Sequence, residues 1–144
     1  MTIPEIQDRI VREFSLFDDW TEKYEHVIKQ GRKLEALPED YRLDENKVKG
    51  CQSQVWLHAE LDGDKVKFYA DSDAMIVKGL VSLLLRVYSD QKPEEILKYP
   101  PEFIKKIDMD THLSPTRANG LVAMVKQIQF YAMAFKTKLE ADKA

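Results

Sequence analysis

The stretch "VWLHAELDGDKVKFYA", residues 55–70, contains the clearest strand signal of the chain. Apolar residues alternate with polar or aromatic ones on both sides of "DGD" at 62–64, which is typical of two half-buried strands joined by a hairpin turn. Helical patterns lie before and after this stretch, without the regular strand–helix alternation of a parallel sheet. We therefore expect an α+β protein, in which a small antiparallel sheet packs against helices.

A helix is predicted directly after the hairpin, over residues 71–88. Apolar residues cover most of its circumference, so we expect it to be the most buried helix. Ser72 or Asp73 is its candidate N-cap, because both side chains accept hydrogen bonds from free backbone amides. Gly79 lies inside this helix, where glycine costs roughly 1 kcal/mol relative to alanine. We therefore expect another backbone to approach it closely.

Two helices are predicted before the hairpin. The first starts at Thr2, which has capping-box spacing to the glutamate three residues later. The second ends at Leu37, because Pro38 disfavours helical geometry in the residue before it. A polar loop over residues 38–50 then leads to the hairpin. Within it, Val48–Lys49 is a candidate for a short third strand.

Three more helices are predicted after residue 88. Short ones are expected at about 93–98 and 101–107. The last helix opens with Ser114 as N-cap and Pro115 as first helical residue, and its apolar face continues to near the C-terminus. Gly120 lies inside this helix, so a close approach of another backbone is expected there as well.

Length and charge narrow the function classes. A chain of 144 residues is expected to form one domain, residues 1–144. Its 22 basic and 25 acidic residues give a net charge of −3. This balance argues against nucleic acid as the main ligand, because phosphate binding needs a concentrated basic surface.

The apolar runs are too short for a membrane span. The longest, residues 75–88, is interrupted by Lys78, Ser82 and Arg86 and falls short of the ~18 residues that a span needs. The N-terminal "MTIPEIQDRI" carries acids where a signal peptide would carry a basic region and a long apolar core. We expect a cytoplasmic protein without membrane association. The single cysteine agrees, because a reducing compartment keeps it as a thiol.

That cysteine, Cys51, lies in "KVKGCQSQVW" at a junction between loop and strand. A lone cysteine is often a small buried apolar residue without chemistry. Here it follows Gly50 and lies among polar residues, as in a surface loop, where functional residues concentrate. If Cys51 is chemical, its thiolate is the nucleophile. Arg117, in the first turn of the last helix, is a candidate stabiliser of that thiolate, and a surface salt bridge is the alternative reading.

Other chemistries find less support. A Cys–His hydrolase or transferase needs a histidine within reach of Cys51. His26 is expected on the solvated side of its helix and His58 away from the core. His112 is expected in a loop that could reach the Cys51 region, but its spacing favours a loop histidine without a function. We find no CxxC, HxxxH or HExxH pattern, so no metal site is expected. No GxGxxG or phosphate-loop sequence supports a bound nucleotide.

Three stretches, "GCQSQVW" (50–56), "DSDAMIVKGL" (71–80) and "HLSPTRANGL" (112–121), resemble the signatures of the SufE family of sulfur-acceptor proteins. The segment "WTEKYEHVIKQGRKL" (20–34) and the N-x-V-x-G-C spacing that ends at Cys51 agree. The resemblance covers nearly the whole chain. It implies a fold similar to the iron–sulfur scaffold (IscU-like) proteins, in which helices cover a curved antiparallel sheet.

The resemblance also implies a function. Family members partner a PLP-dependent, SufS-like cysteine desulfurase and stimulate its turnover. They take its persulfide sulfur onto a cysteine that matches Cys51 and pass it to a downstream iron–sulfur scaffold complex. PLP belongs to the desulfurase, so this chain needs no cofactor and is a sulfur-transfer partner rather than a stand-alone enzyme. A single thiol suits a carrier, because a second thiol nearby would attack the persulfide and release the sulfur.

Several residues are expected to support Cys51. We expect Cys51 to tuck inward at rest and to swing outward on docking, with backbone freedom from Gly50. Asp73 is expected to restrain the loop, and Gln52, Ser53 and Gln54 to stabilise it or to bind the partner. We also expect Trp56 to pack under a helix. A monomer or weak dimer is expected, and a regulatory binding module without sulfur transfer stays open, as does an independent thiol enzyme.

Overall fold

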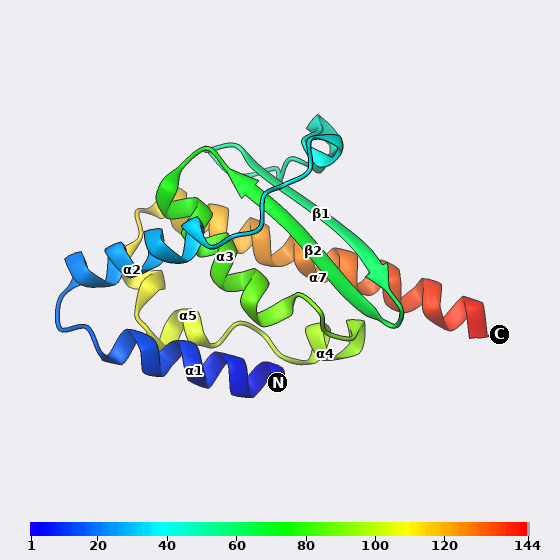
Figure 1. Cartoon of the computed structure of the whole chain (residues 1–144), viewed down its shortest axis with the longest axis horizontal. Helices are drawn as coiled ribbons and strands as arrows, with labels where there is room; N and C mark the ends of the chain where they lie inside the picture. The colour runs from blue at the N-terminus through cyan, green and yellow to red at the C-terminus, as the bar shows by residue number, and fades with distance from the viewer. Residues whose placement is uncertain (144) are drawn as a thin grey trace.

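The computed structural model describes residues 1–143 and has an α+β fold, as predicted (Figure 1). A β-hairpin lies over helices α3 and α7, α1 and α2 pack against α3, and α4 packs against α7. In chain order the elements are α1 (Ile3–Ser15), α2 (Trp20–Arg32), η1 (Glu39–Tyr41), η2 (Asp44–Asn46), β1 (Val55–Asp62), β2 (Lys65–Ser72), α3 (Met75–Tyr88), α4 (Pro93–Lys98), α5 (Phe103–Lys106), α6 (Met109–His112) and α7 (Pro115–Lys143).

The predicted hairpin is confirmed. Strands β1 and β2 pair antiparallel from Asp62 opposite Lys65 to Val55 opposite Ser72. Gly63 takes a positive φ of 65° in the turn between them, a conformation that glycine adopts at little cost. The candidate third strand is reduced to a single bridge between Lys47 and Trp56.

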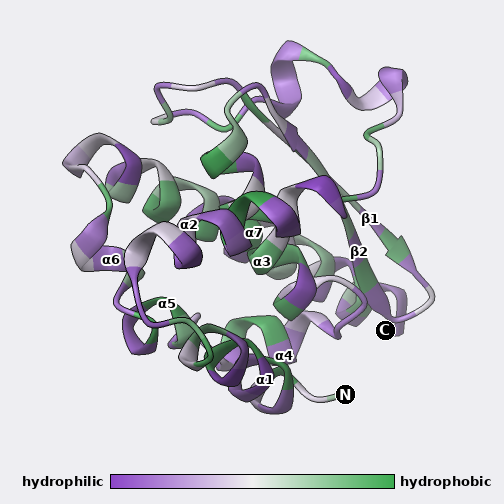
Figure 2. Ribbon diagram, turned by 60° about the vertical axis from the view of Figure 1, so that its left-hand side comes forward, coloured by the Kyte–Doolittle hydropathy of each residue, from purple (hydrophilic) through white to green (hydrophobic). Residues whose placement is uncertain are grey.

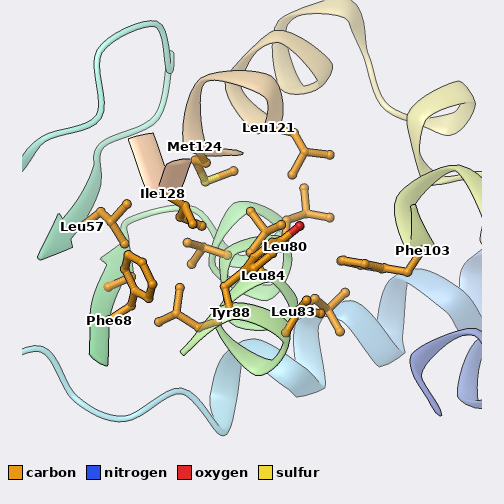
Figure 3. Close-up of a cluster of buried hydrophobic side chains, with 14 of the residues drawn as sticks. Leu57, Phe68, Leu80, Leu83, Leu84, Tyr88, Phe103, Leu121, Met124 and Ile128 are labelled. Carbon is orange, nitrogen blue, oxygen red and sulfur yellow. The ribbon is translucent and has the colours of Figure 1, made fainter. Parts of the chain in front are cut away.

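Helix α3 is the centre of the core, as expected from its apolar circumference. Ten of its residues are buried. In Figure 3, Leu57 and Phe68 of the hairpin lie near Ile128 of α7, and Leu84 of α3 lies beside them. Helix α2 crosses α3 so closely that a Cβ atom added to Gly79 would lie 2.1 Å from the carbonyl oxygen of Val27. The close backbone approach predicted at Gly79 is therefore confirmed.

The helix starts are predicted with mixed success. The Thr2 capping box and the Ser114 N-cap are confirmed, and the Arg117 amide donates to the Ser114 hydroxyl. The N-cap prediction for α3 is wrong. Strand β2 continues through Ser72, and the helix begins only after Ala74, which makes no side-chain cap.

Helix α2 ends earlier than predicted, at Arg32 rather than Leu37. Gly31 weakens the last turn, since glycine is a poor helix former. The next two amides, those of Lys33 and Leu34, bond three residues back in a tight turn. The short helix α6 was not predicted and places His112 at a helix end instead of in a loop.

Two aromatic side chains also differ from expectation. Trp56 packs under the loop of residues 38–50 rather than under a helix, with the Arg42 guanidinium 4.7 Å from its ring centre. His26 is only 13% exposed, because Phe14 of α1 and Phe17 of the α1–α2 connection pack against its ring. Figure 2 shows α1 banded in hydrophilic and hydrophobic colours, as expected of a helix with one side in the core. No helix within residues 1–143 combines the length and apolarity that a membrane span requires.

Candidate functional site

Cys51 lies where the 38–50 loop meets the hairpin, beside the first turns of α7. Gly50 before it has a φ of 93°, which residues with a side chain rarely adopt. The half-buried Cys51 Sγ lies 3.5 Å from the carbonyl oxygen of Gly120, to which the thiol donates. A Cβ atom on Gly120 would lie 3.4 Å from this sulfur and 3.9 Å from the Cys51 Cα atom. Gly120 thus lies in ordinary van der Waals contact with Cys51, mainly with its sulfur, and the close backbone approach predicted there is not found.

Burial raises the pKa of the Cys51 thiol above its ordinary value, because the thiolate loses hydration there. The thiol is therefore protonated at rest near neutral pH. Arg117 is exposed on α7 and forms no ion pair within residues 1–143. The alternative reading of Arg117 as part of a surface salt bridge finds no partner in the described part of the chain.

A cavity of about 370 Å³ opens beside the thiol. Its floor is apolar and comes from α3 and α7, while its rim is polar and comes from the cysteine loop and the start of α7. It brings together four of the residues singled out in the sequence, Cys51, Gln52, Ser53 and Arg117. The remaining lining residues are Val77, Leu80, Ser114, Thr116, Gly120 and Met124.

The C-terminal end of the cysteine loop is tied to the junction between β2 and α3. The Gln54 amide donates to the Asp73 carboxylate at 3.0 Å. The Ser72 hydroxyl and the Asp73 amide both donate to the Gln54 carbonyl oxygen, at 2.9 and 3.3 Å. Asp73 thus contacts the loop of Cys51, and its carboxylate bonds Gln54 rather than capping α3.

The N-terminal side of the loop is anchored by residues to which the sequence alone assigned no part in the site. Arg42 donates to Asp71 at 2.6 Å, and Lys78 of α3 pairs with the same carboxylate at 3.3 Å. Burial works to raise the pKa of Asp71, but hydrogen bonds from Arg42, the Ser72 amide and Lys78 outweigh it and lower that pKa. Arg42 and Asp71 are 29 positions apart, so no local pattern links them.

The three histidines have other partners. His26 bonds Glu13 at 3.2 Å, His58 stacks on Tyr41, and His112 stacks on Trp20. Within residues 1–143, Cys51 Sγ is hydrogen-bonded to no histidine. The described residues also contain no group of three or more His, Cys, Asp or Glu side chains placed to hold a metal ion.

Comparisons with known proteins agree with the resemblance. The family described as "SufE: Fe-S metabolism associated domain" matches residues 8–132. An uncharacterized SufE-like protein of Synechocystis is 39% identical over 94% of this chain and 85% of its own length. Another from Rhizobium meliloti is 40% identical over 85% of this chain and 91% of its own. The solution structure of a hypothetical protein from Thermus thermophilus superposes with a TM-score of 0.78 at 24% identity, covering 95% of this chain and 99% of that one.

Proposed function

This chain belongs to the SufE family, and from that premise we propose that it accepts sulfur from a cysteine desulfurase on Cys51 and passes it to iron–sulfur cluster assembly. Family membership supports a role in iron–sulfur metabolism. The transfer itself is proposed from the geometry around Cys51. PLP is expected in the desulfurase and not in this chain.

The position of Cys51 is the observation that supports the proposal. Its thiol is the only one in the chain and makes one long hydrogen bond, to the Gly120 carbonyl. It follows a glycine with positive φ, in a loop tied at Gln54 by bonds to Ser72 and Asp73. A loop held by a few hydrogen bonds can open at a modest cost, because each contributes only about 1 kcal/mol.

The chemical step is a transfer of one sulfur atom. Cys51 loses its proton, and its thiolate attacks the outer sulfur of the desulfurase persulfide. The bond between the two desulfurase sulfurs breaks, and the electron pair leaves with the desulfurase thiolate. Cys51 then holds the persulfide, and no external oxidant or reductant is needed. The raised pKa disfavours this attack at rest, so the thiol must leave its buried position first.

The residues around the cavity then take distinct roles. Arg117 is free of ion pairs in the described residues and lines the cavity with Cys51, so its charge can stabilise the thiolate as the loop opens and the persulfide when it returns. Gln52 and Ser53, on the cavity rim, and Gln54 are available to the partner once the loop opens. Asp73 holds the resting position through the Gln54 amide.

Replacement of Cys51 by serine tests the proposal. Desulfurase turnover is measured with wild-type protein and with Cys51→Ser, and binding of both to the desulfurase is measured in parallel. We expect Cys51→Ser to bind and to lose stimulation, because serine cannot take up sulfur. A variant that binds and stimulates as well as wild type would instead show a regulatory binding module.

A further inference from the structure

Helix α7 is rich in cations and carries exposed apolar side chains, although the whole chain has a net charge of −3. Residues 115–139 contain four cations, Arg117, Lys126, Lys136 and Lys138, and no carboxylate. Three large apolar side chains of the same helix are exposed to an unusual degree. These are Val122 at 52%, Phe130 at 66% and Met133 at 51%.

Val122, Lys126, Phe130 and Met133 follow one another at spacings of four, four and three residues, so they lie on one side of α7. We call these four residues the docking ridge. Exposed apolar side chains that stand singly need no explanation. A row of them around a lysine on one helix face is the pattern expected of a protein-binding surface.

A groove lies on each side of the docking ridge. One, of about 760 Å³, separates it from the loop that precedes Cys51 and is lined by Lys47, Lys49 and Phe130 among others. The other, of about 380 Å³, separates it from α5 and is lined mainly by apolar side chains such as Ile104 and Val125. Val122 and Lys126 line both grooves. A partner can therefore place side chains on both sides of the same helix.

The charges select the chemistry of that partner. Within residues 1–143, Lys49 and Lys126 form no ion pair, whereas Lys47 pairs with Asp44 at 3.1 Å. The grooves also hold two carboxylates, Glu45 in the larger and Asp110 in the smaller, but lysines outnumber them in both. Free ammonium groups beside exposed apolar side chains therefore complement a segment that carries apolar side chains flanked by carboxylates. A lipid surface is less well matched, since lipid-binding clusters hold four to eight cations close together.

The docking ridge also lies next to the sulfur acceptor. Gly120, which accepts the bond from the Cys51 thiol, precedes Val122 by two residues. A Cβ atom added to Gly50 would lie 3.4 Å from the Cβ atom of Ala123. An occupant of the adjacent groove therefore touches the start of the cysteine loop. The docking ridge lies beside the resting thiol, which carries no sulfur yet. This is the form of the protein that a sulfur donor binds, so we assign the surface to the donor.

We infer that the docking ridge binds the cysteine desulfurase through an acidic segment with apolar side chains. This inference rests on the proposed function and names the surface by which the partner is held. Binding there places the donor beside Gly50, where contact can help to release the loop of Cys51.

The test measures binding to a purified, PLP-containing SufS-type desulfurase at low and high salt. Phe130→Ser and Lys126→Glu should each weaken binding about tenfold at low salt. High salt should reduce the effect of Lys126→Glu and leave that of Phe130→Ser, because salt screens only the charge. The matched controls are Leu16→Ser, an exposed residue of the α1–α2 corner, and Lys138→Glu, on the same helix outside both grooves. Both should bind as wild type does.

The failure of the inference can be told from the failure of the proposed function. Wild-type protein is also treated with inorganic polysulfide, which offers sulfur without the desulfurase. If Cys51 is loaded but the ridge variants bind the desulfurase as tightly as the controls, the inference is overturned and the proposed function stands. The inference is also overturned if the ridge variants bind the desulfurase normally but lose another interaction. Such an interaction would be self-association, binding to anionic vesicles or delivery of sulfur to a downstream acceptor.

Discussion

Removal of the Asp73 carboxylate should speed the reaction of Cys51 with an alkylating reagent. Asp73→Ala deletes the acceptor of the Gln54 amide, 3.0 Å away, and leaves both bonds to the Gln54 carbonyl in place. One such bond contributes about 1 kcal/mol, and the exposed carboxylate adds little through its charge. A loss of about 1 kcal/mol raises the population of the open loop about fivefold.

The assay is the rate of iodoacetamide modification at fixed pH, followed by mass spectrometry of the intact protein. Asp19→Ala is a matched control, because Asp19 is also exposed and accepts a backbone amide, that of Glu22 at 2.8 Å, far from Cys51 in the sequence. We expect Asp73→Ala to react about fivefold faster than wild type and Asp19→Ala to react at the wild-type rate. Equal rates in all three proteins, or equal acceleration in both variants, would refute a specific restraint by Asp73.

Three other predictions concern pH and packing. Alkylation of Cys51 should reach half its maximal rate at a higher pH than free cysteine does, because burial raises its pKa; a lower midpoint would mean that a cation ionises the thiol at rest. Gly79→Ala should lower the free energy of unfolding by roughly 2 kcal/mol or more in urea, because its Cβ would overlap the Val27 carbonyl, and unchanged stability would contradict the observed helix crossing. Hydrogen bonds from Arg86 lower the pKa of Glu13, so the stability they add is present above the unfolded pKa, about 4.3, and lost as pH falls through the lower folded value. The stability difference between wild type and Glu13→Gln should therefore shrink in acid, and a constant difference would argue against this ion pair.

Local sequence patterns predict the secondary elements well but not the contacts between them. The hairpin follows from alternation, and the starts of α1 and α7 follow from capping; both patterns depend on residues a few positions apart. A glycine inside α7 suggests a close backbone approach, but the fold shows instead that its neighbour is the Cys51 sulfur, 69 positions away from Gly120. Asp73 has the sequence context of a helix cap, yet in the fold it accepts the amide of Gln54. The solvated position predicted for His26 is wrong because α1 covers this side chain. The spacing of apolar residues within α2 cannot show which other helix packs against it.

Sulfur on Cys51 is the most direct measure of the whole account. The protein is incubated with the PLP-containing desulfurase and L-cysteine, and the peptide that contains Cys51 is analysed by mass spectrometry without reductant. We expect this peptide to gain one or more sulfur atoms, and to gain none when cysteine is omitted or when Cys51→Ser is used. Stimulated desulfurase turnover with no sulfur on the Cys51 peptide would contradict the account.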